Sequence, residues 1–471
     1  EVGQPNLGIS ILYDALNAAE GISCERCYLP WCDMAGLMRE RHVPLLALES
    51  AAPVASFDLV GFTLAHELVA TNIVETLDLA GIPVHASERT EDDAVVIAGG
   101  PSVWNAEPLA PMFDAILLGD GEEAIVEIAT CVRDERAAGS SRGDILLALS
   151  RIQGVYVPSL YDVVVDDTST RWGYAVPKAG TNAPEVVLKR CIADFASTPA
   201  CAEHIVPYMG IIQDRLAIEV LRGCARGCRF CQAGMTYRPV RERPMEQVVE
   251  ASERGLAETG YDELSLTSLS TTDHSQCAPM LNELDRRFSG RGIRVSIPSQ
   301  RLDSFGVDMA NAASGSKRGG LTFAPEAGTQ RLRDVINKNV TEDDLERAAR
   351  NAFEHGWRRV KLYFMMGLPT ETDEDILAIP AATHRVLEIG REVVGRGKKS
   401  KVQVSASVAV FVPKAHTPFQ WAGQLDVAEV ERRARLLLGA NTDRDVRISY
   451  HDPRTSLVEG ALSKMGRAGF D

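Results

Sequence analysis

The sequence predicts an α/β protein in which a Rossmann-like domain precedes a partial or full α/β barrel. In both halves of the chain, short apolar runs alternate with segments of helical periodicity, as in parallel strands joined by helices. A stretch with strand-like alternation and many prolines separates the halves. We therefore expect a first domain over 1–150, a connector with a β-hairpin over 151–210, a barrel over 211–440 and a C-terminal segment over 441–471.

Apolar runs mark the expected strands in order. Those of the first domain cover 45–50, 58–64, 94–100 and 115–124. The pattern from 68 to 79 predicts a helix that ends before Gly81 and Pro83. The apolar runs that mark the barrel strands cover 215–221, 263–269, 293–299, 320–325, 359–366 and 401–410.

The composition is that of an ordinary globular protein. The 471 residues are 45% hydrophobic and 24% charged, with a formal net charge of −15, which does not favour a generally basic nucleic-acid surface. No apolar run reaches the roughly 18 residues of a membrane span, so we expect no membrane partner. Ten cysteines are too few for a disulfide scaffold and indicate functional thiols in the cytoplasm. Because the chain starts at Glu1 and ends abruptly at Asp471, we expect truncated termini.

Three cysteines follow the first barrel run in a CxxxCxxC pattern, namely Cys224, Cys228 and Cys231. A loop directly after a barrel strand is where barrel enzymes place their chemistry. Three thiolates can hold three irons of a cubane cluster and leave the fourth iron open, whereas structural zinc and structural clusters use four ligands. The pattern therefore predicts a [4Fe-4S] cluster. A zinc site that lacks one ligand, or scattered core cysteines, are the alternatives.

The segment CARGCRFCQAG, with the barrel pattern behind it, resembles the radical S-adenosylmethionine superfamily over nearly the whole chain. The resemblance implies that the open iron binds the methionine moiety of S-adenosylmethionine and that the reduced cluster cleaves this cofactor to a 5′-deoxyadenosyl radical. It also implies cofactor contacts in the barrel loops: Phe230 on the adenine or the cluster, Ser268 and Ser270 on the methionine amino group, Ser299 and Arg301 on its carboxylate, Glu326 on the ribose, and Gly367 and Val412 on the adenine. Core packing for Phe230, and solvated loop positions for the others, are the alternatives.

The first domain resembles the cobalamin-binding domain of one branch of this superfamily. The resemblance lies in VGFTL (60–64), IAGGPSVWNAEPLA (97–110) and LLGDGEEA (117–124). Glycines at strand ends let a backbone approach a ligand in the switch-point crevice of a doubly wound sheet. The cobalamin candidates are therefore Thr63, Gly99, Gly100, Pro101, Gly119, Gly121 and Glu122. The cobalt-ligating motif DxHxxG is absent, which implies cobalamin with its base detached and no protein His ligand, or a crevice without cobalamin.

A second group of cysteines lies near the start of the chain, at Cys24, Cys27 and Cys32. Their spacing can bind zinc or a second cluster, although no fourth ligand is obvious nearby. The alternative is that these thiols bind no metal.

Together these features predict a radical enzyme that methylates an unknown substrate (a small molecule, RNA or protein) with cobalamin as methyl carrier. A flavodoxin or ferredoxin would supply electrons. A rearrangement or a hydrogen abstraction is the alternative within this chemistry. A methylthiotransferase acting on tRNA or protein is the second interpretation, although that branch has widely spaced N-terminal cysteines and a small C-terminal β domain. A non-enzymatic cluster-bearing sensor or assembly factor is the third.

Overall fold

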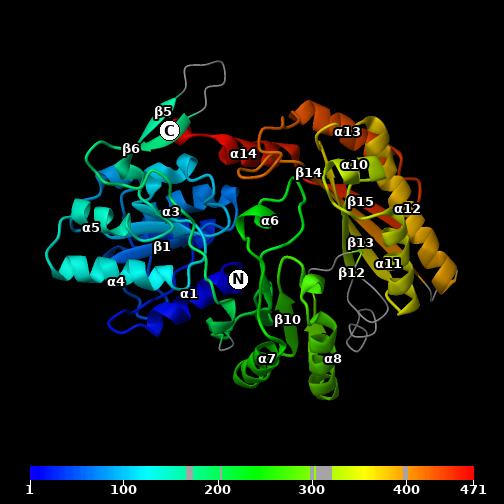
Figure 1. Cartoon of the computed structure of the whole chain (residues 1–471), viewed down its shortest axis with the longest axis horizontal. Helices are drawn as coiled ribbons and strands as arrows, with labels where there is room; N and C mark the ends of the chain where they lie inside the picture. The colour runs from blue at the N-terminus through cyan, green and yellow to red at the C-terminus, as the bar shows by residue number, and fades with distance from the viewer. Residues whose placement is uncertain (166–172, 202–203, 298–301, 304–320, 396–400, 471) are drawn as a thin grey trace. The chain divides into compact units, whose positions relative to one another are not determined.

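The computed structural model describes residues 1–165, 173–201, 204–297, 302–303, 321–395 and 401–470 (Figure 1). They form two compact units. The first comprises Glu1–Asp194 together with Ala461–Asp471, and the second comprises Phe195–Gly460. Among the described residues, no helix is both long and apolar enough to cross a membrane.

A small sheet forms the centre of the first unit. Three parallel strands, β1 (Leu59–Thr63), β2 (Val95–Gly99) and β3 (Ala115–Leu117), are followed by β4 (Val155–Tyr156), which pairs with β3 in antiparallel orientation. Because successive side chains of a strand point to opposite faces, Val95 and Ile97 are buried in one core while Val96 and Ala98 are buried in another. Both faces of the sheet are therefore covered, which explains why this run is continuously apolar.

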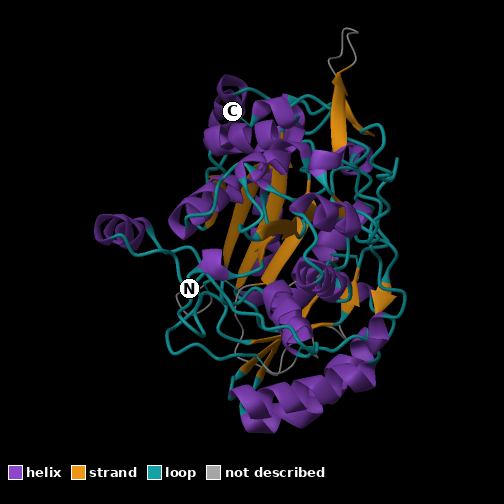
Figure 2. Ribbon diagram, turned by 90° about the vertical axis from the view of Figure 1, so that its left-hand side faces the viewer, coloured by secondary structure: helices purple, strands orange, loops and turns teal. Residues whose placement is uncertain are grey.

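Helices cover the two faces of this sheet. One face packs against α2 (Cys32–Arg41) and α3 (Ala70–Ala80), and the other packs against α1 (Leu7–Asn17), α4 (Ala124–Ala137) and α5 (Arg142–Leu149). The helix α3 is the one predicted between 68 and 79, and it ends at Gly81, whose φ of 71° is the left-handed conformation that glycine adopts at low cost. The expected hairpin is present as β5 (Tyr161–Val165) and β6 (Gly173–Pro177), and it projects from this unit (Figure 2).

The expected strand at 45–50 does not form. Leu46 makes only an isolated bridge to Pro53, and Leu45 accepts a hydrogen bond from the backbone of Val54 at 2.9 Å, so the run folds back on itself instead of joining the sheet. The described strands consequently lie in sequence order, β1-β2-β3-β4. Among the described strands, the order therefore shows no reversal of the kind that marks the switch point of a doubly wound sheet.

The boundaries of the first unit also differ from the expected ones. Residues 151–194 belong to it because their chain returns to the sheet: the backbone N–H of Arg190 donates to the carbonyl of Leu118 at 2.8 Å. Residues 461–471, expected in a separate C-terminal segment, belong to it as well, and Arg467 forms an ion pair there. These links between distant segments are made by single residues, which periodicity cannot reveal.

The second unit contains two parallel sheets. The first has the order β11-β10-β7, with β7 (Leu216–Glu219), β10 (Glu263–Thr267) and β11 (Arg294–Ser296). The second has the order β12-β13-β14-β15, with β12 (Leu321–Glu326), β13 (Arg359–Met366), β14 (Gln403–Val410) and β15 (Val446–Tyr450). All six predicted barrel strands are therefore present. A seventh, β15, was not predicted. A short antiparallel pair, β8 (Leu221–Arg222) and β9 (Arg241–Glu242), follows β7.

Helices connect these parallel strands and bury their apolar side chains. Along β13, Val360, Leu362, Phe364 and Met366 are all buried, in the alternation that a half-covered strand predicts. Figure 1 shows α11, α12 and α13 along one side of this sheet. The helices of this unit are α6 (Ala233–Thr236), α7 (Met245–Thr259), α8 (Cys277–Phe288), α10 (Gln330–Val335), α11 (Glu342–Glu354), α12 (Asp373–Val394) and α13 (Val427–Gly439), and α14 (Pro453–Lys464) continues into the first unit.

Candidate functional site

The loop that carries the predicted cluster ligands begins directly after β8. Gly223 makes the turn out of the strand with a φ of 87°, and a Cβ at this position would lie 2.6 Å from the carbonyl oxygen of Tyr237. Only glycine fits such a close approach of two backbones. The first cysteine, Cys224, comes next in the chain, so the local geometry of the strand end fixes where the ligand loop starts.

The three cysteines lie on one short loop, and the backbone N–H of Cys231 donates to the Cys228 carbonyl at 3.1 Å. Burial raises the pKa of the Cys231 thiol, and the charges of Cys228 and Cys224 raise it further. The backbone N–H of Gly234 donates a hydrogen bond to the Cys231 Sγ at 3.3 Å. Three thiols on one short loop are a donor set that fits an iron–sulfur cluster, because the iron replaces the thiol protons on binding.

Hydrogen bonds connect this cysteine loop to segments that follow the strands β12 and β14 of the second sheet. The Asn337 side chain donates to the Gly227 carbonyl at 2.8 Å, and the backbone N–H of Arg229 donates to the Ile336 carbonyl at 3.0 Å. The Gln232 side chain donates to a carbonyl in the loop after β14, at 3.1 Å. No sequence pattern predicts these contacts, which join residues about one hundred positions apart or more.

The loop after β10 contains the two serines assigned to the methionine amino group. Ser270 is only 2% exposed, and its hydroxyl donates to Asp273 at 2.8 Å. The Ser268 hydroxyl lies 2.7 Å from the Thr271 hydroxyl and is partly buried. Ser268 therefore remains the better placed of the two for a ligand, whereas Ser270 is committed to the loop's own structure. Ser299 and Arg301, the expected carboxylate contacts, lie outside the described residues.

The expected ribose contact, Glu326, lies at the end of β12 and close to the cysteine loop. Its charge contributes to the raised pKa of Cys231, and its φ of 69° is unusual for a residue with a side chain. Its carboxylate accepts a hydrogen bond from the Lys338 ammonium at 3.0 Å, and both side chains are largely buried. Sequence reasoning missed Lys338, because a single lysine after a helix carries no recognisable signal.

Three further candidates lie around a small apolar cluster built from Ala327, Leu332, Ile336, Leu368 and Phe411. Phe230, in the cysteine loop, packs against this cluster, as the core-packing alternative predicts. Gly367 and Val412 are direct chain neighbours of two cluster members, at the ends of β13 and β14. The cluster thus brings together the ends of three predicted barrel elements.

Gly367 is held by a buried carboxylate. Its backbone N–H donates to the Glu371 Oε2 at 2.6 Å, and the Arg433 guanidinium contacts the same oxygen at 2.5 Å. Burial raises the pKa of Glu371 to about 7. The turn after β13 is therefore fixed by an ion pair between the start of α12 and the helix α13.

The cobalamin candidates of the first unit lie at or after the ends of β1, β2 and β3, but their glycines have partners within the chain. A Cβ at Gly119, where φ is 115°, would lie 2.0 Å from the carbonyl oxygen of Arg190, and a Cβ at Gly100 would lie 2.9 Å from that of Leu64. Likewise, a Cβ at Gly121 would meet the side chain of a leucine in α1 at 3.0 Å. Close self-packing thus accounts for these glycines. The remaining candidates are Thr63, which ends β1, Gly99, which ends β2, Pro101 and the half-buried Glu122.

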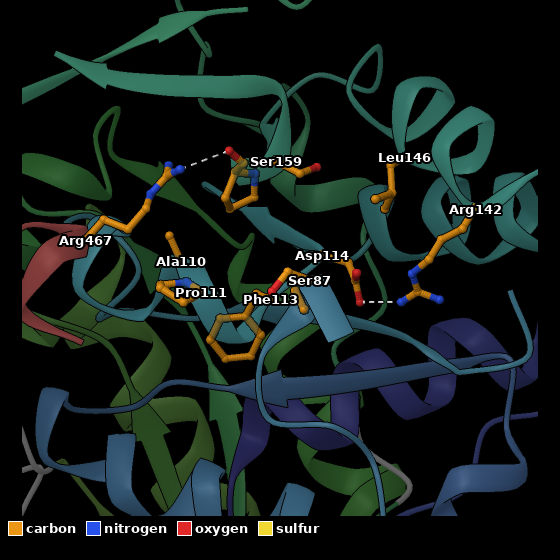
Figure 3. A pocket seen from close by; sticks show the side chains of 11 residues that line it. Ser87, Ala110, Pro111, Phe113, Asp114, Arg142, Leu146, Ser159 and Arg467 are labelled. Atoms are coloured by element: carbon orange, nitrogen blue, oxygen red, sulfur yellow. Dashed lines mark hydrogen bonds and ion pairs between the residues drawn. The ribbon is translucent and has the colours of Figure 1, made fainter. Parts of the chain in front are cut away.

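A pocket of about 290 Å³ in the first unit lies elsewhere (Figure 3). Its lining includes Asp114, which directly precedes β3, so the pocket opens near the amino ends of the strands, whereas doubly wound sheets bind cofactors at the carboxyl ends. None of the cobalamin candidates lines it. Figure 3 shows Asp114 paired with Arg142 and the Arg467 guanidinium donating to a backbone oxygen.

The second cysteine group does not assemble into a site. Cys24 packs against one core of the first unit and Cys27 against the other, while Cys32 is exposed. Burial raises the pKa of both Cys24 and Cys27 to about 11, and neither thiol contributes to the shift of the other. In the cysteine loop of the second unit, by contrast, the charges of Cys228 and Cys224 contribute to the raised pKa of Cys231.

Comparisons with known proteins agree with this division of the chain. Residues 8–158 match the family described as radical SAM proteins, N-terminal, and residues 218–379 match the radical SAM superfamily. An uncharacterized protein of Methanocaldococcus jannaschii is 27% identical over 94% of this chain and 86% of its own length. The tRNA-2-methylthio-N(6)-dimethylallyladenosine synthase of Petrotoga mobilis is 23% identical over 39% of this chain and 44% of its own length.

Two solved structures share the fold over most of the chain. The radical S-adenosylmethionine methyltransferase TsrM from Kitasatospora setae, determined with cobalamin and a [4Fe-4S] cluster, has a TM-score of 0.54 and 16% identity and covers 85% of this chain and 71% of its own. The cobalamin-dependent S-adenosylmethionine radical enzyme OxsB has a TM-score of 0.57 and 13% identity and covers 97% of this chain. The present chain spans 63% of OxsB, less than two thirds of its length. At these identities the likeness is one of fold.

Proposed function

Since the chain belongs to the radical S-adenosylmethionine superfamily, we propose that Cys224, Cys228 and Cys231 hold the [4Fe-4S] cluster with which it cleaves S-adenosylmethionine. The single observation that carries this assignment is the position of the three cysteines on one loop directly after β8, within the residues 218–379 that match the superfamily. When bound, the cluster supplies the electron that breaks a carbon–sulfur bond of the cofactor.

The residues around the cysteine loop would bind and orient S-adenosylmethionine. The Ser268 hydroxyl is an acceptor for the methionine amino group, and the Glu326 carboxylate is an acceptor for the ribose hydroxyls. The backbone at Gly367 and Val412 borders the adenine, where the apolar cluster with Phe230 excludes water from the reacting centre. The Lys338 ammonium would hold the Glu326 carboxylate in place through its hydrogen bond.

Methyl transfer through cobalamin is the finer part of this proposal. Its support is the likeness of fold to TsrM and OxsB, two proteins described with cobalamin, over 85% and 97% of this chain. The first unit would hold the cofactor through the ends of its strands at Thr63, Gly99, Pro101 and Glu122. Without the motif DxHxxG in the chain, we expect no protein His on the cobalt.

A methylthiotransferase activity fits less well. The tRNA-modifying relatives match between 27% and 56% of this chain, and the cysteines at 24 and 27 pack against separate cores. Any enzyme of the superfamily needs a reductant and a substrate. For this chain we propose flavodoxin or ferredoxin as the electron donor, and a substrate that is a small molecule, an RNA or a protein.

Anaerobic reconstitution tests the cluster assignment. The wild-type protein should bind four irons per chain and release 5′-deoxyadenosine from S-adenosylmethionine in the presence of dithionite. The triple alanine variant at Cys224, Cys228 and Cys231 should lose both properties, and a matched triple variant at the other cysteine group should keep them. If the first variant retained four irons and cleaved the cofactor, the assignment would be wrong.

Two measurements test the role of cobalamin. The cob(II)alamin form should show no nitrogen superhyperfine splitting from a protein ligand in its EPR spectrum, and failure to retain cobalamin after growth with it would exclude the cofactor. With a cell extract as substrate source, methyl transfer should yield equal amounts of 5′-deoxyadenosine and S-adenosylhomocysteine. Formation of 5′-deoxyadenosine without S-adenosylhomocysteine would instead indicate a rearrangement or a hydrogen abstraction.

A further inference from the structure

One side chain of the cysteine loop contacts the loop after β10, which belongs to the first sheet of this unit. Arg226, between the first two cysteines, forms a bidentate ion pair with Asp273: its Nε lies 3.1 Å from Oδ2, and its Nη2 lies 2.5 Å from Oδ1. The carboxylate of Asp303 lies 3.6 Å from the remaining Nη1. All three side chains are partly buried, so solvent screens this pair less than it screens a surface ion pair.

The partner of Arg226 is itself fixed at the end of β10. Asp273 ends the short turn Thr271–Asp273, and its Oδ2 also accepts the hydroxyl of Ser270 at 2.8 Å. The same loop carries Ser268, the candidate acceptor for the methionine amino group. A rigid planar fork that binds a carboxylate with two parallel bonds fixes direction as well as distance. The link therefore relates the position of the cluster loop to that of the methionine-binding loop.

The backbone of the cysteine loop is fastened in the other direction, through the carbonyl of Gly227 and the N–H of Arg229, to residues that follow the second sheet's first strand. Among the described strands, β11 and β12 are not paired with each other. The cysteine loop thus joins the two sheets of the second unit at the carboxyl ends of their strands, and Arg226 is the side chain that makes the connection to the first sheet.

This pair also places charge beside the assigned cluster ligands. Arg226 lies two residues from both Cys224 and Cys228, so its guanidinium and the carboxylates of Asp273 and Asp303 adjoin the ligand loop. A positive charge near a cluster favours its reduced form, and a negative charge disfavours it. In the wild-type protein the guanidinium offsets the negative charge of the carboxylates at this position.

We infer that Arg226 is a positioning residue whose ion pair with Asp273 aligns the cluster with the methionine-binding loop and balances the charge beside the cluster. This inference rests on the proposed function, since it takes the three cysteines as cluster ligands. It concerns a residue that is not itself a ligand. Its two consequences, one electrostatic and one geometric, are separately measurable.

The electrostatic consequence is tested by potentiometric titration of reconstituted protein followed by EPR. Arg226→Gln leaves the Asp273 charge unbalanced, so the midpoint potential of the cluster should fall. Asp273→Asn leaves the guanidinium unbalanced, so the potential should rise. The double variant restores the balance and should titrate close to the wild-type protein. Shifts of the same sign, or no shift in either single variant, would overturn the inference, because simple loosening of the loop cannot move the potential in opposite directions.

The geometric consequence is tested with Arg226→Lys, which keeps the charge but loses the fork. Its cluster should titrate near the wild-type potential, while its affinity for S-adenosylmethionine, measured by equilibrium dialysis with the oxidised protein, should fall on the order of tenfold. Unchanged affinity would overturn the positioning role. This affinity measurement also tests the inference if Arg226→Gln or Asp273→Asn binds no cluster.

The ion pair between Arg385 and Glu346, which joins α12 to α11, provides a matched control. Arg385→Gln and Glu346→Gln should leave both the potential and the affinity unchanged, and effects as large as those at Arg226 would overturn the inference. A failure of the proposed function looks different: the wild-type protein would then bind no cluster, whereas a failure of this inference leaves a wild-type cluster with unresponsive variants.

Discussion

Replacing Asp114 with asparagine is expected to destabilise the first unit by about 3–5 kcal/mol, the cost of removing one partner from a buried ion pair. The Oδ2 of Asp114 accepts hydrogen bonds at 2.8 Å from the Arg89 Nη1, the Arg142 Nη2 and the backbone N–H of Val96. The Asp114 side chain is 2% exposed and that of Arg89 is fully buried. Asparagine keeps the shape but removes the negative charge that two guanidinium groups share.

This loss is a large fraction of the roughly 5–15 kcal/mol by which domains are stable. The expected site of damage is the sheet, because Asp114 joins the start of β3 to the backbone of β2. Urea unfolding followed by hydrogen exchange of β2 and β3 peptides measures the effect in this unit alone. The exposed pair of Arg385 and Glu346 supplies the comparison: Glu346→Gln should cost about 0–1 kcal/mol. A loss below 1 kcal/mol in the Asp114 variant would show that its ion pairs contribute no more than surface pairs.

Three shorter predictions concern other parts of the chain. Burial raises the pKa of Glu371 from its ordinary 4.5 to about 7, so between these pH values the folded protein holds a proton that the unfolded chain releases. The free energy of unfolding should therefore fall by up to about 3 kcal/mol as the pH rises from about 4.5 to 7. Glu371→Gln should flatten this part of the profile of stability against pH, and an unchanged slope would contradict the assignment. Gly119→Ala should lower the free energy of unfolding in urea by more than about 3 kcal/mol, because its Cβ would meet the Arg190 backbone at a positive φ. Gly36→Ala inside α2 is the control: its Cβ would have no neighbour within 4 Å, so stability should stay unchanged or rise by about 0.5–1 kcal/mol. Equal effects of the two variants would refute the packing argument. Iron analysis should find four irons per chain in reconstituted wild-type protein, and the same number after serine replaces Cys24, Cys27 and Cys32. Eight irons in the wild-type protein that fall to four in the variant would show a second cluster at these cysteines.

The strands of the second unit could be predicted from sequence because their burial is regular. In β13 every second residue is buried, so the apolar alternation at 359–366 matches the strand in the structure. The strand β15 was missed for the opposite reason. Only Val446 among its residues is buried, and the rest of this edge strand is half-buried or exposed, so its sequence shows little apolar pattern. Periodicity thus reports burial, and an edge strand with little burial gives little signal.

The run at 45–50 shows the converse error. Its leucines are apolar enough for a strand, but a strand also requires a partner for its backbone. Here the backbone of the run bonds partly to residues five to nine positions later and partly to Arg26 and Leu79, none of which lies in a strand of the sheet. An apolar pattern records that side chains are buried. It does not record whether the backbone hydrogen bonds are local or belong to a sheet.

The candidate cluster site could be predicted as a set of ligands but not as an assembled site. The spacing of its cysteines is a local property, and the structure places all three on one loop after β8. The side chains that hold the ligand loop, Arg226 on Asp273 and Asn337 on Gly227, are brought together only by the fold, over separations of 47 and 110 residues. Neither residue type is specific enough to single out in a sequence with so many charged side chains.

The glycines of the first unit mark the limit of motif reasoning most sharply. A glycine at a strand end indicates that another group approaches the backbone closely, but that group can be a cofactor or another part of the same chain. At Gly119 the approaching group is the backbone of Arg190, at a distance that leaves no room for a Cβ. The glycine is therefore required whether or not cobalamin binds. It follows that the support for a cofactor in this unit comes from the fold it shares with cobalamin-binding proteins and from direct binding measurements, since at Gly100 and Gly119 the close approach is already made by the chain itself.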